Sequence, residues 1–132
     1  MIYNFVKWLK NQNAGLTIYT NTVETPSVDK MVLVKEYGGP ERPLLRIKSI
    51  QIICRDVDVV KAKQLADTIY GQIQSSTLIG GRFGQILPAV TVGGVVYPSV
   101  QIAQMRSIQL PGSIGQDENG RYEISFNFDV YF

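Results

Sequence analysis

The sequence predicts an α+β fold in which a mainly antiparallel sheet carries two packed helices and ends in a C-terminal β-hairpin. Two segments, 2–13 and 56–76, repeat their apolar residues with the period of a helix. Several shorter runs are rich in β-branched and aromatic residues and are bounded by turn-forming residues: 30–36, 44–55, 100–110 and 121–132. One domain over 1–132 is expected, because no repeat, low-complexity tract or linker indicates a boundary.

The first segment predicts a short amphipathic helix over 2–13. Its apolar face consists of Ile2, Phe5, Val6 and Leu9. Lys7 and Lys10 point outward, and Gly15 stands where the helix should stop. A short strand over 17–20 is expected next, followed by a loop rich in turn-forming residues.

Two strands are predicted in the next part of the chain. Residues 30–36 are apolar on both faces, which is typical of an interior strand. The stretch YGGPERP, 37–43, predicts a turn, because its glycines and prolines do not fit a strand ladder. A further strand over 44–55 changes the phase of its apolar residues near Ser49, which indicates a β-bulge.

The segment 56–76 has the most regular helical pattern. Its apolar face consists of Ala62, Leu65, Ala66, Ile69 and Ile73. Gly71 lowers helix stability by about 1 kcal/mol relative to alanine, so tertiary packing has to hold the last turn. Asp56 or Asp58 is expected to cap the N-terminus, because both stand where the helix begins. A carboxylate pair for acid–base chemistry or cation binding is the less favoured interpretation of these two residues.

The last third predicts β structure that ends in a hairpin. Residues 77–98 are interrupted by glycines and form either short strands joined by turns or a mobile loop. A strand over 100–110 and a connection over 111–120 lead to the final strand, 121–132. One side of that strand carries Tyr122, Ile124, Phe126, Phe128, Val130 and Phe132.

So apolar a strand would promote aggregation if its edge stayed open. It should therefore be paired, covered by another element, or given to a neighbouring subunit. We take the last of these as the main hypothesis.

The composition argues against several classes of function. The chain has no histidine, one cysteine and a net charge of +2. A Ser-His-Asp triad or an ordinary zinc cluster cannot be built within one chain without histidine and with a single cysteine. The net charge is too small to predict sequence-specific nucleic-acid binding. We predict no catalytic residue and no metal ligand, and we expect no cofactor.

The single cysteine, Cys54, lies in an apolar strand, which favours a buried structural residue over a reactive thiol. One cysteine allows no internal disulfide and suits a reducing cytoplasm. No secretion signal or membrane-spanning segment is indicated, so we expect a soluble protein without a membrane partner.

Three polar features carry weaker signals. The acidic pair at 117–118 suits solvated residues of a hairpin loop. The stretch GGRFGQ, 80–85, lacks the glycine spacing and the following lysine of a phosphate-binding loop. Positive charge gathers at Arg42, Arg46 and Lys48, where a solvated loop flank and a contact with an acidic protein surface or a DNA backbone both remain open.

Three segments together resemble the tail terminators of bacteriophages, small neck proteins also labelled minor capsid proteins in siphophages. They are MVLVKEYGGPERP (31–43), IQIICRDVDVVKAKQLADTIYGQI (50–73) and GQDENGRYEISFNFDVYF (115–132). The resemblance implies a non-enzymatic virion protein that is made in the cytoplasm of the host bacterium. It also implies a hexameric ring of identical copies on the last layer of the tail tube. Such a ring stops tube growth, offers a surface for the head-side connector or adaptor protein, and lets phage DNA pass through its lumen without sequence-specific binding.

Interface residues are predicted from the ring hypothesis, in two loops and the final strand. They are Tyr37, Glu41, Arg42, Arg46, Arg82, Phe83, Tyr122, Phe126, Phe128 and Phe132. Another head–tail adaptor or completion protein stays open as an alternative. A small ligand-binding domain that uses residues 80–94 as a lid is the alternative from a different class, and an enzyme ranks third.

Overall fold

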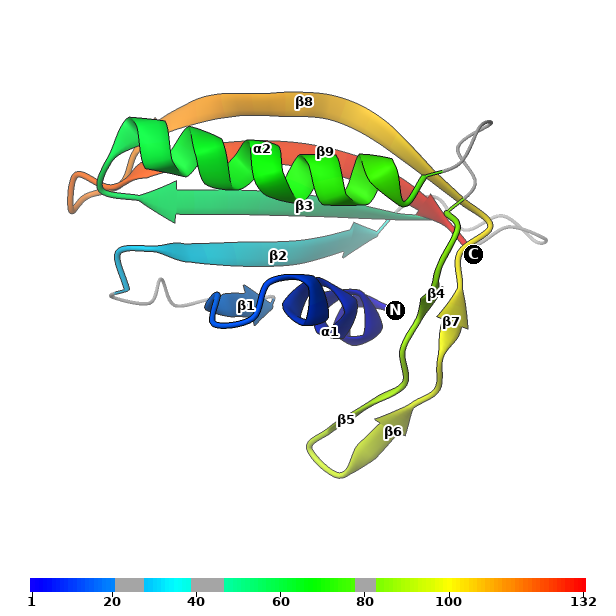
Figure 1. The fold of residues 1–132 in the computed structure, drawn as a ribbon. Helices are drawn as coiled ribbons and strands as arrows, with labels where there is room; N and C mark the ends of the chain where they lie inside the picture. Colours follow the sequence, from blue (N-terminus) through cyan, green and yellow to red (C-terminus); the bar gives the residue numbers. More distant parts are fainter. Residues whose placement is uncertain (21–27, 39–46, 78–82) are drawn as a thin grey trace.

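The computed structural model describes residues 1–20, 28–38, 47–77 and 83–132, and within them it shows an α+β fold. Five strands form one sheet in the order β1-β2-β3-β9-β8, and two helices lie on one of its faces (Figure 1). All neighbouring strands of this sheet are antiparallel except β1 and β2, which are parallel. The helices are α1 (Ile2–Gln12) and α2 (Val59–Ser75), and the strands are β1 (Ile18–Thr20), β2 (Met31–Gly38), β3 (Ile47–Asp56), β8 (Gln104–Gln116) and β9 (Tyr122–Tyr131). The predicted fold class, two helices and terminal hairpin are confirmed.

The hydrophobic core lies between the helices and the sheet. Val34, Ile52 and Phe126 stand in register across β2, β3 and β9, and all three are fully buried. The α1 helix contacts β1 and β2, while α2 contacts β3 and β9, so both helices contribute to one apolar cluster. Tyr70 on α2 packs its ring against Phe126 and Phe128, with centroid distances of 5.5 and 5.6 Å. The predicted apolar faces of both helices and of the final strand thus meet in one core.

The final strand lies inside the sheet, which corrects one expectation. β9 pairs with β3 from Tyr122 to Tyr131 and with β8 on its other side. The hypothesis that this strand gives its edge to a neighbouring subunit is therefore wrong, because both edges are used within the chain. Among the described strands, the outermost one at this side of the sheet is β8.

The bulge predicted near Ser49 is absent, and β3 keeps a continuous register with both neighbours. The change of phase has a simpler cause, because Ile50 and Ile52 face the helices while Ile47 and Ile53 lie on the opposite face of the sheet. The register shifts of the described strands occur in β8. That strand also runs on to Gln116, so most of the connection predicted over 111–120 is strand, and the turn begins only at Asp117.

From residue 86 onward the glycine-interrupted region forms short strands, as one of its two interpretations predicted. They are β4 (Ile86–Leu87), β5 (Val90–Val92), β6 (Val95–Tyr97) and β7 (Val100–Gln101). β4 pairs with β7, and β5 pairs with β6 around Gly93 and Gly94, whose φ angles of 58° and 79° suit a tight hairpin turn. We call residues 86–101 the arm, because they extend away from the sheet and from α2, past α1 (Figure 1).

Some expectations lie outside the described residues. The turn predicted over 37–43 begins with Tyr37 and Gly38, which the structure assigns to β2, and the rest of it is not described. Within the described ranges, neither helix is long and apolar enough to cross a membrane.

Candidate assembly surfaces

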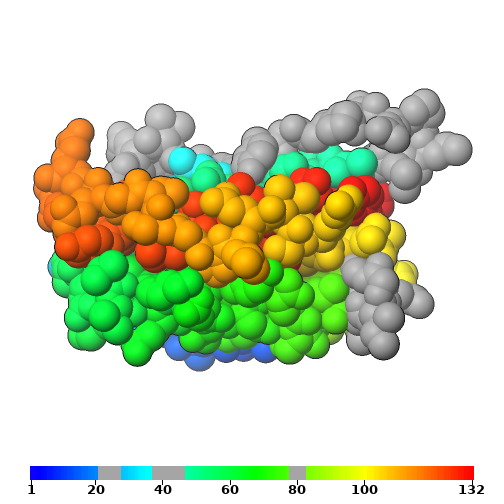
Figure 2. Space-filling model, turned by 90° about the horizontal axis from the view of Figure 1, so that it is seen from above, coloured from blue at the N-terminus to red at the C-terminus, as the bar shows by residue number. Residues whose placement is uncertain are grey.

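The outer edge of β8 exposes three large aliphatic side chains. Ile108, Leu110 and Ile114 are 53%, 69% and 53% exposed. Each lies within one of the three register shifts against β9, which fall between Ser107 and Gln109, between Gln109 and Gly112, and between Ser113 and Gly115. Residues in a bulge lose their place in the alternation of the sheet, so the bulges turn these side chains outward. Figure 2 shows β8 running across the molecular surface above α2.

The chain around this edge is almost free of charge. From Phe83 to Gln116 the only charged residue is Arg106, although 18% of the whole chain is charged. This stretch includes the arm and nearly all of β8. Depletion of charged residues, together with exposed aliphatic side chains, is the compositional mark of the centre of a protein–protein interface.

The arm exposes a second apolar surface near its tip. Val95 and Val96 are 53% and 68% exposed, and Val92 beside them is also exposed. A tight hairpin with so little of its own apolar area buried gains little stability by itself. The arm therefore depends on contacts at its base.

Helix α1 supplies those contacts. The side-chain amide nitrogen of Asn4 donates to the backbone oxygens of Pro88, Tyr97 and Pro98 at 3.0, 3.3 and 2.8 Å. Lys7 Nζ donates to the backbone oxygen of Ala89 at 2.8 Å. These bonds reach the chain segments on both sides of the β5–β6 hairpin. Helix α1 therefore fixes the direction in which the arm leaves the sheet and helices.

Aromatic side chains of α1 extend the same support. The rings of Tyr3 and Tyr97 lie 5.0 Å apart, and those of Trp8 and Phe83 lie 5.3 Å apart. The indole N–H of Trp8 also donates to the side-chain oxygen of Gln85. Sequence reasoning identified α1 from its core-facing pattern, but nothing in that pattern indicated that its second face holds the arm.

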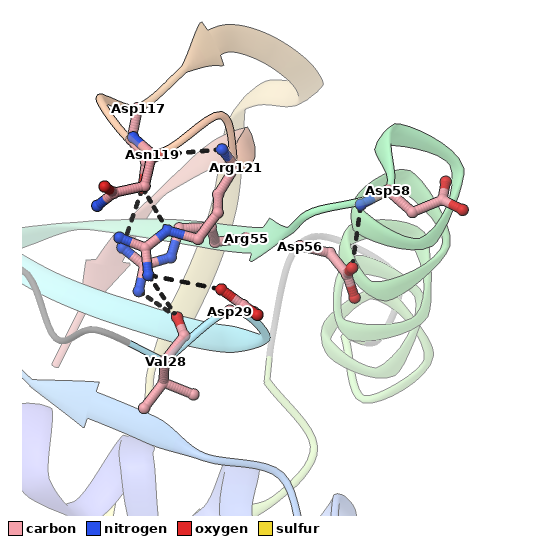
Figure 3. Close-up of polar contacts among 8 residues, drawn as sticks. All are labelled: Val28, Asp29, Arg55, Asp56, Asp58, Asp117, Asn119 and Arg121. Carbon is pink, nitrogen blue, oxygen red and sulfur yellow. Dashed lines mark hydrogen bonds and ion pairs between the residues drawn. The ribbon is translucent and has the colours of Figure 1, made fainter.

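A buried cluster of charges fixes the turn between β8 and β9 (Figure 3). Arg121 Nε donates to Asp117 Oδ2 at 2.8 Å, and Arg55 Nη1 lies 3.5 Å from the same oxygen. Both arginines also donate to the backbone oxygen of Val28. The cluster thus joins the turn to the end of β3 and to the segment before β2.

The protonation of this cluster follows from its geometry. Desolvation acts to raise the pKa of Asp117, but hydrogen bonds from the backbone and side chain of Arg121 and from the backbone of Asn119 outweigh it and hold that pKa below its usual value. Burial, followed by the nearby charge of Arg121, lowers the pKa of Arg55. The sequence predicted a solvated acidic turn, and this is wrong for Asp117, whose side chain is only 12% exposed. Glu118 is exposed, as predicted.

The other candidate residues from the sequence, Asp56, Asp58 and Cys54, contribute to the structure of the subunit. Asp58 caps α2, because its Oδ1 accepts from the backbone N–H groups of Val60 and Lys61, and Asp56 Oδ1 accepts from the N–H of Asp58. The prediction that one of these two residues caps the helix is confirmed for Asp58. Cys54 is fully buried, and burial raises the pKa of its thiol. Among the described residues no group of three or more potential ligand side chains could hold a metal ion.

The residues predicted at an interface are distributed over different environments. Phe83, Phe126 and Phe128 are buried within the subunit, whereas Tyr122 and Phe132 are partly exposed. Tyr37 lies in β2. The remaining four lie outside the described residues: Glu41, Arg42, Arg46 and Arg82. The structure does not bring the ten together at one surface among the residues it describes, and their role in assembly stays a prediction.

Comparison with known proteins gives one specific result. A search among curated proteins found no match. One solved structure is 16% identical over 98% of this chain and 89% of its own, with a TM-score of 0.44, a likeness too low to support a conclusion. The family model described as "Bacteriophage tail terminator protein" matches residues 9–131, which is nearly the whole chain. The chain therefore belongs to the bacteriophage tail terminator family and is a structural component of a phage tail.

Proposed function

We propose that copies of this protein form a ring on the last layer of the tail tube and thereby end tail polymerisation. The ring holds six copies, as the resemblance to tail terminators implies. Its opposite surface receives the head-side connector or adaptor protein, and phage DNA passes through the lumen. The protein has no catalytic role in this proposal.

The observation that carries this proposal is the exposed edge of β8. In an isolated monomer, three bulges that expose Ile108, Leu110 and Ile114 to water would not stabilise the fold. An edge of this kind suits permanent contact with another protein surface. The family match over residues 9–131 supplies the biological setting, because the tail tube is the structure that such a protein ends.

The predicted loop contacts fit the same proposal. Glu41, Arg42, Arg46 and Arg82 carry charge, and we propose that they contact the tail tube protein or the connector rather than the neighbouring copy. Tyr122 and Phe132 are the partly exposed members of the predicted set in the final strand segment, and they are proposed to lie at the rim of the interface.

Electron microscopy of purified tail tubes mixed with the full-length protein tests this function. We expect extra density at one end of each tube and no further growth when tail tube protein is added. Tubes that keep growing in the presence of excess protein contradict the proposal. If the protein instead remains on DNA-filled heads and leaves isolated tails bare, it is a head-side adaptor.

A further inference from the structure

The arm and the outer edge of β8 are two different surfaces with the same unusual chemistry. Both expose aliphatic side chains, and Arg106 is the only charge between Phe83 and Gln116. The arm points away from β8 in the subunit, so the two surfaces do not cover one another (Figure 1). One chain thus carries two separate apolar surfaces, each without a partner among the described residues.

We infer that the arm of one copy packs against the outer edge of β8 of the next copy. The partner is a second copy of this chain, because the chain itself supplies a surface of matching chemistry for each of the two. Contact between two different patches is heterologous, and repetition of such a contact gives a closed ring when the rotation between copies divides a full turn, and an open filament otherwise. The inference rests on the proposed ring of identical copies, but it does not require that the ring end a tail.

The backbone favours this pairing as well. β8 is the last strand of its sheet, so its outer side has backbone groups that no strand of the sheet uses. Among the described residues, the β5–β6 hairpin consists of two strands, and no further strand pairs with either of its outer sides. Strand addition between the hairpin and β8 would satisfy both, while Val95 and Val96 cover the aliphatic side chains that the bulges turn outward.

The base of the arm explains how the contact is made specific. Asn4 and Lys7 on α1 bond to backbone oxygens on both sides of the hairpin, so the arm leaves each subunit in a fixed direction. A prealigned arm loses less conformational freedom on docking than a mobile loop. The angle between successive copies, and with it the number that closes a ring, would then be set by α1.

Cysteine cross-linking tests the contact directly, because the native Cys54 is fully buried and does not compete for reagent. One preparation carries Val96→Cys and another Leu110→Cys, both at exposed positions. A short bifunctional thiol reagent should link the mixture into dimers, and the double variant should give a ladder of linked species up to the full ring. The reaction is run on free protein and on protein bound to purified tail tubes. Val96→Cys mixed with Gln12→Cys, at the exposed end of α1, is the matched control and should stay unlinked.

Three results would overturn the inference. Linking of Val96→Cys alone as efficiently as of the mixture would show a contact between identical patches. Linking of Leu110→Cys to Thr20→Cys, in place of Val96→Cys, would show that β8 meets the β1 edge of the next sheet. Tubes that carry the protein without any linking of the mixture would leave the proposed function standing and remove the arm contact. A ladder of linked copies that never caps a tube would support the arm contact and contradict the proposed function.

A charge placed in the interface gives a second readout. Leu110→Lys should raise the concentration needed for half-maximal assembly by about tenfold or more, because a buried ammonium group opposes the contact. Val57→Lys, at an exposed valine outside both surfaces, should assemble like the unmodified protein. Thermal unfolding should be unchanged in both variants. Equal assembly of the two variants would contradict the inference.

Discussion

The side-chain amide of Asn4 on α1 donates a hydrogen bond to the backbone oxygen of Pro98 at the base of the arm, over 2.8 Å. Asn4 is almost completely buried, so its side-chain amide depends on partners within the chain rather than on bulk water. The contact joins the first helix of the chain to a hairpin that follows more than ninety residues later. It makes the orientation of the arm a property of the N-terminal helix.

Asn4→Ala should destabilise the subunit by about 1–3 kcal/mol, because it removes the partly buried hydrogen bonds to the backbone oxygens of Pro88 and Pro98. Hydrogen exchange should also become faster at the amides of residues 90–97. Urea unfolding and exchange mass spectrometry measure the two effects. Asn11→Ala, at an exposed position of the same helix, is the control and should change neither. Unaltered exchange in the arm of Asn4→Ala would show that α1 does not hold it.

Phe126→Ala should unfold or strongly destabilise the subunit, at a cost of about 3–5 kcal/mol, because it opens a cavity beneath α2. Leu110→Ala should change stability by less than about 0.5 kcal/mol, since its side chain is mostly exposed. Chemical denaturation of both variants separates a core residue from a surface residue. If Phe126→Ala kept full stability and lost only assembly, the original prediction of Phe126 as an interface residue would be favoured.

Acidification should weaken the turn between β8 and β9. The pKa of Asp117 is lower in the folded chain than its ordinary value of 3.8, so its ionised form stabilises the fold above that pH and the contribution is lost as the pH falls through the folded pKa. The stability difference between the unmodified protein and Asp117→Asn should therefore be present at pH 7 and shrink below about pH 4. Glu118→Gln, in the same turn, is the exposed control. A difference that does not depend on pH would contradict this account.

Removing the cap of α2 should have a moderate effect. Asp58→Ala should cost about 1 kcal/mol, because the N–H of Val60 loses its acceptor at 2.8 Å. Asp67→Ala removes an exposed ion pair with Lys63 in the same helix and should cost less than about 0.5 kcal/mol. Thermal unfolding at neutral pH compares the two. Equal losses would show that the ion pair matters as much as the cap.

The thiol of Cys54 should not react with an aromatic disulfide reagent while the chain is folded. Its side chain is fully buried on β3, and burial raises the pKa of the thiol, so little thiolate is present at neutral pH. Absorbance after mixing should show one thiol per chain only when denaturant is added. Fast reaction of the native protein would mean that β3 opens readily, and it would require a cysteine-free background for the cross-linking test.

The features that could be predicted from the sequence are those that depend on residues close together in the chain. The period of Ala62, Ala66, Ile69 and Ile73 identified α2 because a helix with one buried face repeats its apolar residues in that way. The alternation along β9 identified which of its residues enter the core, for the same local reason. The cap could be narrowed to Asp56 or Asp58 because capping involves only residues two or three positions away, and the structure shows that Asp58 is the cap.

Relationships between distant segments were not accessible from one sequence. The alternation of β9 is the same whether its neighbours belong to its own chain or to another, so its interior place in the sheet could not be read from it. The phase shift near Ser49 and the bulges of β8 show the same limit, because a bulge is defined by the partner strand. The burial of Asp117 could not be predicted for a similar reason, because the ion pair with Arg55 involves a residue of a different strand. One signal was available: the near absence of charge from Phe83 to Gln116 points to the candidate surfaces without any structure.

The place of β9 between β3 and β8 also determines when a newly synthesised subunit can complete its sheet. On the ribosome, β3 and β8 are both synthesised before the strand that joins them, so β8 cannot join the sheet until β9 has emerged. A nascent chain therefore cannot present a finished β8 edge to its neighbours. In the proposed ring, recruitment would be restricted to subunits whose translation has passed that point, which would keep incomplete chains out of the assembly.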